Sequence, residues 1–159
     1  MISVVIVNFN AGALLSANVT RLAQIALQEP LSIVIVDNGS TDSSLTAVQR
    51  LENWPQLTLR IIENLENRGF ATAFNQGIRA SDSQYVLCLN PDCLLELDTL
   101  RLTREALEGN EQAGMAGALI LNPDGSEQRG CRRELPDIMN SALYLSGLAN
   151  VFPKRYRRL

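Results

Sequence analysis

The chain has 159 residues, enough for one sizeable hydrophobic core but few for two, and its 46% hydrophobic and 19% charged residues are typical of a folded protein. Its formal net charge is −3, and because four basic residues lie within the last six positions, the rest of the chain is acidic, which excludes general nucleic-acid binding. Histidine is absent and Lys154 is the only lysine, which excludes histidine-based triads and metal sites as well as Schiff-base and phosphate-loop lysines.

Apolar runs alternate with helical patterns along the chain. The runs predict strands over residues 2–7, 31–36, 57–62, 85–89 and 115–121. Helices are expected over residues 13–28, from 42 or 43 to about 53, over 70–80, and from 98 or 99 to 108. The third strand is the least apolar and contains Arg60, so we expect it near an edge of the sheet.

This alternation predicts an α/β fold with a mostly parallel sheet and helices on both faces, the Rossmann-like arrangement of a nucleotide-binding half. We expect one domain over residues 1–135, followed by a helix and basic tail over 136–159. Three cysteines without metal-like spacing predict reduced thiols, and the first residues form a strand pattern rather than a signal peptide. We therefore expect a cytoplasmic protein.

The string LNPD occurs twice, in different surroundings. The second copy, Leu121–Gly125, is a run of turn-forming residues, so a hairpin turn is expected there, with a return strand over 127–133. In the first copy, Leu89–Cys93, no glycine follows and the chain returns to apolar residues. This pattern puts Asp92 at the carboxyl end of a buried strand, where it either caps the next segment or faces a ligand.

Polar residues also follow the first two strands, as Asn8 and Asn10 after one and Asp37 after the other. If the first strand lies between the second and fourth, these ends converge with Asn90 and Asp92 at the ligand-binding edge of an α/β sheet. Asp37 could then accept from a base N–H or a ribose hydroxyl. Asp92 offers the oxygen ligands that Mg²⁺ or Mn²⁺ prefer, with diphosphate oxygens and water completing the shell.

Five segments together resemble the inverting family 2 glycosyltransferases, in particular the rhamnosyltransferase-like enzymes of bacterial surface polysaccharides. They are VVIVNFN, IVIVDNGSTDSS, ENLENRGFATAFNQGIRA, YVLCLNPDCLLE and GALILNPDGSEQRGCRR, and they span about Ile2 to Arg133. The resemblance implies a GT-A fold, a nucleotide-diphospho-sugar donor (dTDP- or UDP-sugar, with GDP close behind), and Mg²⁺ or Mn²⁺. The function it implies is sugar transfer to a surface-polysaccharide acceptor.

The resemblance also implies roles for individual residues. Asn90-Pro91-Asp92 stands where other members carry Asp-x-Asp, so Asp92 would bind the metal, although Asn90 departs from the two-carboxylate form. Asp37 would contact the nucleobase or ribose, and Asn8 and Asn10 would lie near the base. The remaining nucleotide-binding residues that the resemblance implies are Asn67, Arg68 and Gly69, with Arg68 a partner for phosphate or a carboxylate.

No catalytic base can be assigned, because nothing after Arg133 matches the Glu-Asp motif that supplies it in the family. We therefore expect the 159-residue chain alone to transfer sugar weakly or not at all, and a non-catalytic nucleotide-sugar-binding or partner module is the alternative. Three interpretations of residues 138–158 stay open: a helix packed on the sheet, an interface for another part of the protein, or an interfacial helix. The last would hold the protein peripherally at the inner face of the membrane, near a lipid-linked acceptor.

Overall fold

The structure is a computed structural model that describes residues 1–50, 56–128 and 131. The chain divides into two compact units, Met1–Gly114 and Met115–Leu159, called here the first and second unit. The expected tail over 136–159, and with it the membrane contact through 138–158, lies outside the described residues, so both stay predictions. Among the helices that are described, none has the length and apolar character needed to cross a membrane.

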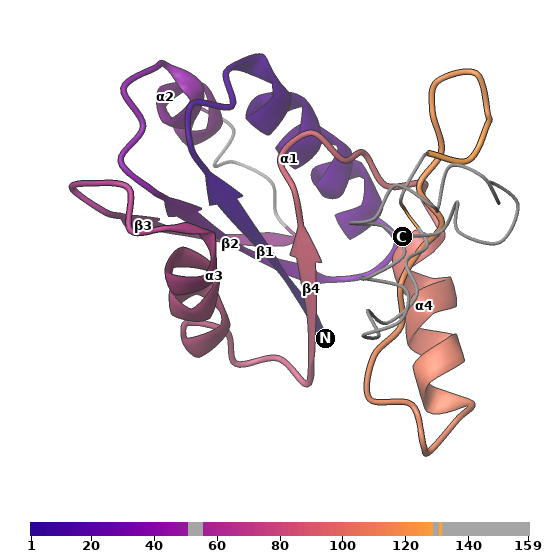
Figure 1. The fold of residues 1–159 in the computed structure, drawn as a ribbon. Helices are drawn as coiled ribbons and strands as arrows, with labels where there is room; N and C mark the ends of the chain where they lie inside the picture. Colours follow the sequence, from indigo (N-terminus) through magenta and orange to yellow (C-terminus); the bar gives the residue numbers. More distant parts are fainter. Residues whose placement is uncertain (51–55, 129–130, 132–159) are drawn as a thin grey trace, which may run out of the picture. The chain divides into compact units, whose positions relative to one another are not determined.

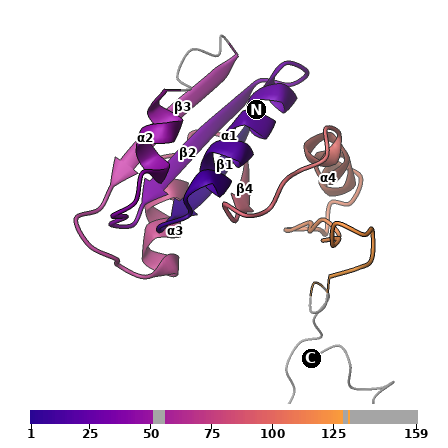
Figure 2. The same ribbon diagram turned by 90° about the horizontal axis from the view of Figure 1, so that it is seen from above.

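The first unit is built on a four-stranded sheet. Its strands are β1 (Ile2–Asn8), β2 (Leu31–Asp37), β3 (Leu57–Glu63) and β4 (Tyr85–Leu89). They lie in the order β3-β2-β1-β4 and every pairing is parallel, as Figures 1 and 2 show. The parallel α/β sheet, the central place of β1 between β2 and β4, and the edge position of β3 are therefore confirmed.

Helices cover both faces of this sheet, as expected (Figure 1). They are α1 (Ala13–Ala26), α2 (Ser44–Gln49), α3 (Phe70–Arg79) and α4 (Thr99–Glu108). Because successive strand residues point to opposite faces, Val4 and Ile6 of β1 join the core that contains residues of α1, α2 and α4. Val5 and Val7 join the core of the other face, which α3 covers through Ala73.

Helix ends differ from expectation in two places. The first helix ends at Ala26 rather than at residue 28, because the next amides bond in tighter turns, from Leu27 N to Gln24 O at 3.3 Å and from Gln28 N to Ile25 O at 2.9 Å. The second ends at Gln49, and its expected extension to residue 53 lies mostly outside the described residues.

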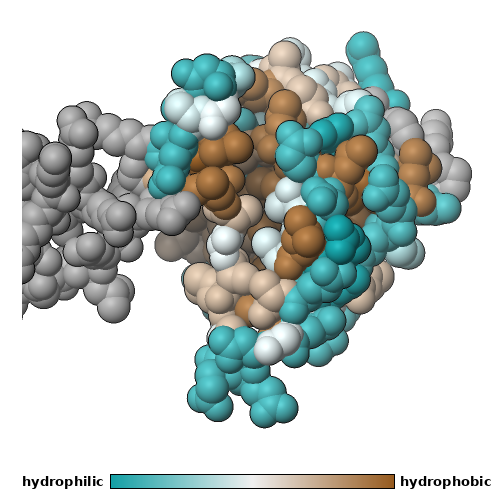
Figure 3. Space-filling model, turned by 90° about the vertical axis from the view of Figure 1, so that its right-hand side faces the viewer, coloured by the Kyte–Doolittle hydropathy of each residue, from teal (hydrophilic) through white to brown (hydrophobic). Residues whose placement is uncertain are grey.

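Several apolar side chains of the first unit, in β4 and in the residues that follow it, are exposed. Val86 of β4, Leu94 and Leu97 of the segment after it, and Leu102 of α4 all lie in contact with solvent. Figure 3 shows apolar and polar patches interspersed over one face of the molecule. The segment of residues 90–98, which links β4 to α4, is called the strap below.

In the second unit, the expected strand over 115–121 is wrong. The described residues there form a single antiparallel bridge, between Leu121 and Glu127. A strand needs a neighbour for its backbone groups, and this bridge is that segment's only ladder contact among the residues the structure describes. Met115, at the start of the segment, is 89% exposed. The apolar run therefore indicated a strand, but it did not show whether a neighbouring strand would be there to pair with it.

The hairpin turn expected at the second LNPD copy is confirmed. Asn122 and Ser126 are joined by a 2.8 Å backbone hydrogen bond, and Gly125 N donates to Asn122 O at 2.9 Å with φ +80° at the glycine. The Asp124 carboxylate accepts from both the amide and the hydroxyl of Ser126. Of the expected return strand over 127–133, the bridge at Glu127 is described, whereas residues 129, 130, 132 and 133 lie outside the described part.

Candidate functional site

Three neighbouring strands of the first unit end in polar residues at the same edge of the sheet. The register puts Asn8 of β1 opposite Asp37 of β2, and Ile6 of β1 opposite Leu89, the last residue of β4. Asn90 therefore begins the strap one step beyond the end of β4, next to the carboxyl end of β1. Such an edge is where open α/β sheets bind ligands.

Asn8 is fully buried and its amide holds Asp37. Asn8 Nδ2 donates to Asp37 Oδ1 at 2.6 Å and reaches the hydroxyls of Ser44 at 2.8 Å and Ser40 at 3.1 Å. Asp37, only 5% exposed, also accepts from Ser40 N at 3.0 Å. Because these acceptors already use the two N–H groups of Asn8, its amide orients Asp37 instead of reaching outwards to a ligand.

Two loops beside Asp37 are tied together by Asn10, which has a positive φ of 53°. Asn10 Oδ1 accepts from Thr41 N at 2.8 Å and Asp42 N at 3.3 Å, and Asn10 N donates to Ser40 Oγ at 3.0 Å. Asp42 in turn accepts from Gly12 N at 2.8 Å. A hydrogen bond from the Ser44 hydroxyl, with further backbone bonds, lowers the pKa of the Asp42 carboxyl.

Gly39 lets the segment before α3 lie directly on this turn. Its φ is +80°, and a Cβ there would lie 2.8 Å from the backbone carbon of Glu66 and 2.9 Å from that residue's Cα. Both atoms belong to backbone, which cannot move aside cheaply. The glycine is therefore required for its conformation and also for the close approach of the two loops.

Asn38, buried at the end of β2, holds the predicted nucleotide-binding segment. Asn38 Nδ2 donates to Asn67 Oδ1 at 2.8 Å, and Asn38 Oδ1 accepts from Arg68 N at 3.0 Å and Asn64 Nδ2 at 3.2 Å. Asn67 Oδ1 also accepts from Gly69 N at 2.9 Å. The structure thus brings Asn67, Arg68 and Gly69 to the end of β2, beside Asp37.

The first LNPD copy also turns the chain, because Cys93 N donates to Asn90 O at 3.1 Å. The two copies differ in what surrounds this turn: the first follows a strand of the sheet directly, and Cys93 then packs against the core. Asp92 and Asn90 are exposed. The next helix begins at Thr99 with Asp98 at its N-cap position, so Asp92 does not cap that helix.

Asp92 also influences the thiol of its neighbour. Burial raises the pKa of the Cys93 thiol, and the charge of Asp92 together with a hydrogen bond to it raises that pKa further. This environment favours the thiol of Cys93 over the thiolate.

The donor set suits a divalent cation that arrives with a phosphate ligand. In the described ranges there is no group of three or more His, Cys, Asp or Glu side chains that could hold a metal ion. Asp92 nevertheless offers an exposed carboxylate, and Mg²⁺ is commonly bound by one or two carboxylates, with phosphate oxygens and water in its other positions. The residues present therefore fit a shared metal–diphosphate site rather than a preformed metal cage.

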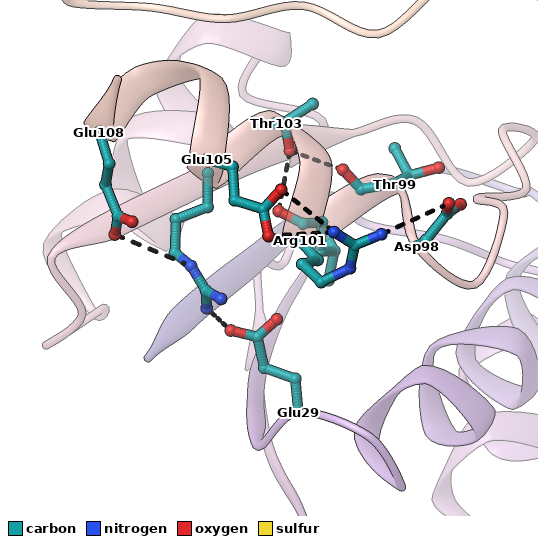
Figure 4. A network of polar contacts seen from close by, with 9 residues as sticks. Glu29, Asp98, Thr99, Arg101, Thr103, Glu105 and Glu108 are labelled. Carbon is teal, nitrogen blue, oxygen red and sulfur yellow. Dashed lines mark hydrogen bonds and ion pairs between the residues drawn. The ribbon is translucent and has the colours of Figure 1, made fainter. Parts of the chain in front are cut away.

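A pocket of about 250 Å³ lies elsewhere, between the end of α1 and α4. It lies near Pro30, just before β2 begins, at the opposite end of the strands from Asp37. Arg104 pairs with Glu29 and Glu108. Figure 4 shows the neighbouring pairs of Arg101 with Asp98 and Glu105. Since these charges pair with one another, we interpret the network as attaching α4 to α1.

Sequence reasoning named candidate residues at the strand ends but missed two of the residues that hold them, Asn38 and Asn64. Neither residue is among the binding residues that the sequence predicts. The sequence does contain a signal for Asn38, because this residue directly follows the last residue of β2 and precedes a glycine. The Asn38 side chain bonds to two side chains and one backbone amide, all 26 to 30 residues away, and no local sequence pattern contains such pairings.

Comparisons with known proteins show the family of the chain. The family model described as Glycosyl transferase family 2 matches residues 3–153. The chain is 29% identical over 156 residues to the N-acetylglucosaminyl-diphospho-decaprenol L-rhamnosyltransferase of Mycobacterium tuberculosis (strain CDC 1551 / Oshkosh), covering 91% of this chain and 48% of the relative. It is 31% identical over 70 residues to the poly-beta-1,6-N-acetyl-D-glucosamine synthase of Staphylococcus aureus (strain COL), covering 44% and 16%.

Solved structures show the same fold. The mannosyltransferase PcManGT from Pyrobaculum calidifontis, in complex with GDP-Man and Mn²⁺, matches with a TM-score of 0.66 and 26% identity over 77% of this chain and 36% of its own. S. aureus TarS 1-349 in complex with UDP-GlcNAc matches with a TM-score of 0.60 and 21% identity, over 69% and 32%. The chain thus spans about half the length of the rhamnosyltransferase and about a third of these two structures.

Proposed function

We propose that this chain, which belongs to glycosyl transferase family 2, binds a nucleoside-diphosphate sugar at the carboxyl ends of β2, β1 and β4 for transfer of the sugar to an acceptor. The observation that carries the proposal is the adjacency of Asp37, Asn8 and the Asn90–Asp92 turn along one edge of the sheet. In a member of this family, such an edge would supply both a partner for the nucleotide and a ligand for the metal.

The nucleoside would bind on the β2 side of this edge. Asp37 is held by Asn8 and Ser40, so its carboxylate is already oriented before a base or ribose arrives. Asn67, Arg68 and Gly69 lie beside it through Asn38, and the exposed Arg68 guanidinium would pair with a phosphate. Asn10 acts on the nucleotide through the loops that it ties together.

The diphosphate would bind on the β4 side, where Asp92 would hold Mg²⁺ or Mn²⁺ and Asn90 would offer an amide to the nucleotide. The metal, when bound, neutralises charge on the departing diphosphate. PcManGT, a structural neighbour of this chain, forms a complex with both GDP-Man and Mn²⁺, which supports a metal role for this chain's exposed carboxylate. Because Asp92 is a lone carboxylate, we expect metal affinity to depend on the nucleotide.

The finer assignments rest on the resemblance. We propose a dTDP- or UDP-sugar donor, with inversion at the sugar, and a lipid-linked saccharide acceptor for a bacterial surface polysaccharide. The decaprenol in the name of the mycobacterial relative supports a lipid-linked acceptor. Transfer would take place on the cytoplasmic side, with peripheral contact at the membrane. The catalytic base is unassigned, and residues 134–159 contain only two acids, Glu134 and Asp137, so the 159-residue chain would transfer sugar weakly.

Thermal unfolding with UDP, dTDP and GDP, each with and without Mn²⁺, tests this function. At about 100 times its dissociation constant, a bound nucleotide adds about 2.7 kcal/mol to the free energy of unfolding, which raises Tm by several degrees. We expect one nucleotide to give a shift that requires Mn²⁺. Asp92→Ala should abolish the metal-dependent part of that shift.

Asp124→Ala is the matched control, because it removes the same residue from the other LNPD copy. That variant should keep the full metal-dependent shift, even if its own Tm falls with the loss of the bonds from Ser126. A shift that is equal in Asp92→Ala and wild type would contradict the metal assignment. The absence of a shift with every nucleotide would contradict donor binding by this chain.

A further inference from the structure

We infer that Asn18 of α1 is a positioning residue that holds the Asn90–Cys93 turn and thereby fixes the carboxylate of Asp92 for metal binding. This inference rests on the proposed function, since it concerns the same metal–diphosphate site. Asn18 lies 72 residues or more from the atoms that it contacts, so its role follows from the folded structure and not from any local pattern.

Asn18 is 1% exposed and reaches the strap from the face of α1 that packs on the sheet. Its Nδ2 donates to Asn90 O at 3.0 Å and to Cys93 O at 2.8 Å. These two carbonyls flank Pro91 and Asp92. One side chain thus bridges both ends of the turn, and Cys93 N closes the turn onto Asn90 O from inside.

The chemistry of the two partners fixes the orientation of the Asn18 amide. Both are carbonyl oxygens, which only accept, so the NH₂ group must face them and the amide oxygen must point away. Asn18 Oδ1 is buried and has no hydrogen-bond partner within the part of the chain that the structure describes. Burying an unpaired acceptor opposes folding. A leucine of similar shape would avoid this cost, but it would also remove the two hydrogen bonds to Asn90 O and Cys93 O.

Arg21, one helical turn further along α1, attaches the strap at a second point. Its Nε donates to Leu95 O at 2.7 Å and its guanidinium pairs with Glu96 at 3.2 Å. Both contacts lie beyond Cys93, on the side away from Asp92. Arg21 therefore makes the same kind of bond as Asn18, from the same helix to the same strap, without bridging the turn.

A held turn matters because Asp92 is exposed and no cluster of other potential metal ligands surrounds it among the described residues. If the turn moves, the carboxylate samples many directions and only a fraction of them suit the metal. The apparent metal affinity falls with that fraction. Removing groups that orient a metal ligand typically lowers metal affinity by about 10- to 100-fold. The two hydrogen bonds from Asn18 to Asn90 O and Cys93 O are called the clamp below. The clamp should raise metal affinity and leave metal-free nucleotide binding on the β2 side unchanged.

The test compares Asn18→Leu with Arg21→Met by two measurements. The first is the dissociation constant of Mn²⁺ at saturating nucleoside diphosphate, chosen as the nucleotide that wild type binds, with metal-free nucleotide affinity measured alongside. The second is amide hydrogen exchange of the metal-free protein over residues 89–98. Asn18→Ala, which removes the same two bonds without adding bulk, guards against a packing defect in the leucine variant.

In Asn18→Leu we expect Mn²⁺ to bind at least about tenfold more weakly, metal-free nucleotide affinity to stay within about twofold, and exchange to rise at Cys93, whose amide closes the turn. Arg21→Met should keep Mn²⁺ affinity within about twofold and raise exchange only from Leu95 onwards. Unchanged exchange in Asn18→Leu would overturn the clamp, and faster exchange with unchanged Mn²⁺ affinity would overturn its role in positioning. Wild type that binds no Mn²⁺ with any nucleotide would instead overturn the proposed function, a result that the exchange measurement keeps separate from failure of the clamp.

Discussion

Replacing Asn8 by alanine is expected to lower the free energy of unfolding by about 3 kcal/mol. The change removes the donor to Asp37 Oδ1 and the contacts to Ser40 and Ser44, all within a fully buried site. The Asp37 carboxylate, 5% exposed, would then keep only the Ser40 amide among these donors. Leaving a buried carboxylate without a hydrogen-bond partner costs far more stability than leaving a buried neutral group without one.

Chemical denaturation followed by circular dichroism measures this effect, and in a thermal scan it corresponds to a fall in Tm of about 6 to 12 °C. Asn122→Ala is the matched control, because that half-buried side chain bonds to Ser126 within the hairpin and to no other side chain among the described residues. The control should change the free energy of unfolding by about 0.5 kcal/mol or less. If Asn8→Ala were as mild as the control, Asp37 would not depend on Asn8, and its orientation would need another explanation.

Gly77→Ala is expected to destabilise the protein by about 1 to 3 kcal/mol, although alanine is the better helix former. A Cβ at position 77 would lie 2.3 Å from Val5 Cγ1 and 3.3 Å from Val36 Cγ2. Both valines are fully buried and branched at Cβ, so neither can rotate away without a new clash. The helix α3 would have to move off the sheet, and the segment Asn67–Gly69 that precedes it would move as well.

Gly114→Ala is the control for Gly77→Ala, because a Cβ at position 114 meets no atom within 4 Å. We expect it to be neutral or slightly stabilising in the same denaturation experiment. The double variant Val5→Ala, Gly77→Ala should be more stable than the sum of the two single changes predicts, because the smaller side chain makes room for the new methyl group. Additive effects would show that the clash is relieved elsewhere and that α3 does not press on β1 at this position.

The arrangement of strands could be predicted because each strand is a short apolar run with polar residues at its end. Asn8, Asp37 and Asp92 follow such runs, and the edge of a parallel sheet collects the ends that neighbour one another. The segment over 115–121 has the same apolar character, but its strand did not form in the described residues. Pairing depends on a neighbour with free backbone groups, and an apolar run carries no information about that neighbour.

The supports of the site were missed for a different physical reason. Asn18 lies within a helix whose pattern indicates only an amphipathic face, and Asn38 lies in a turn whose residues already explain the turn. Each acts through hydrogen bonds to groups about 30 or more than 70 residues away. Such partners become neighbours only when the sheet has formed, so periodicity and turn chemistry do not reveal them.

Electron paramagnetic resonance of Mn²⁺ tests the central claim most directly, since it detects the metal itself rather than its effect on unfolding. Free Mn²⁺ gives a strong spectrum that weakens when the ion binds a large molecule, so the signal can be titrated with protein at saturating nucleoside diphosphate. We predict loss of free signal with wild type and with Asp124→Ala, and a signal equal to that of the nucleotide alone with Asp92→Ala. Binding by Asp92→Ala as tight as by wild type would contradict the claim, because the metal would then be held without the carboxylate at the end of β4.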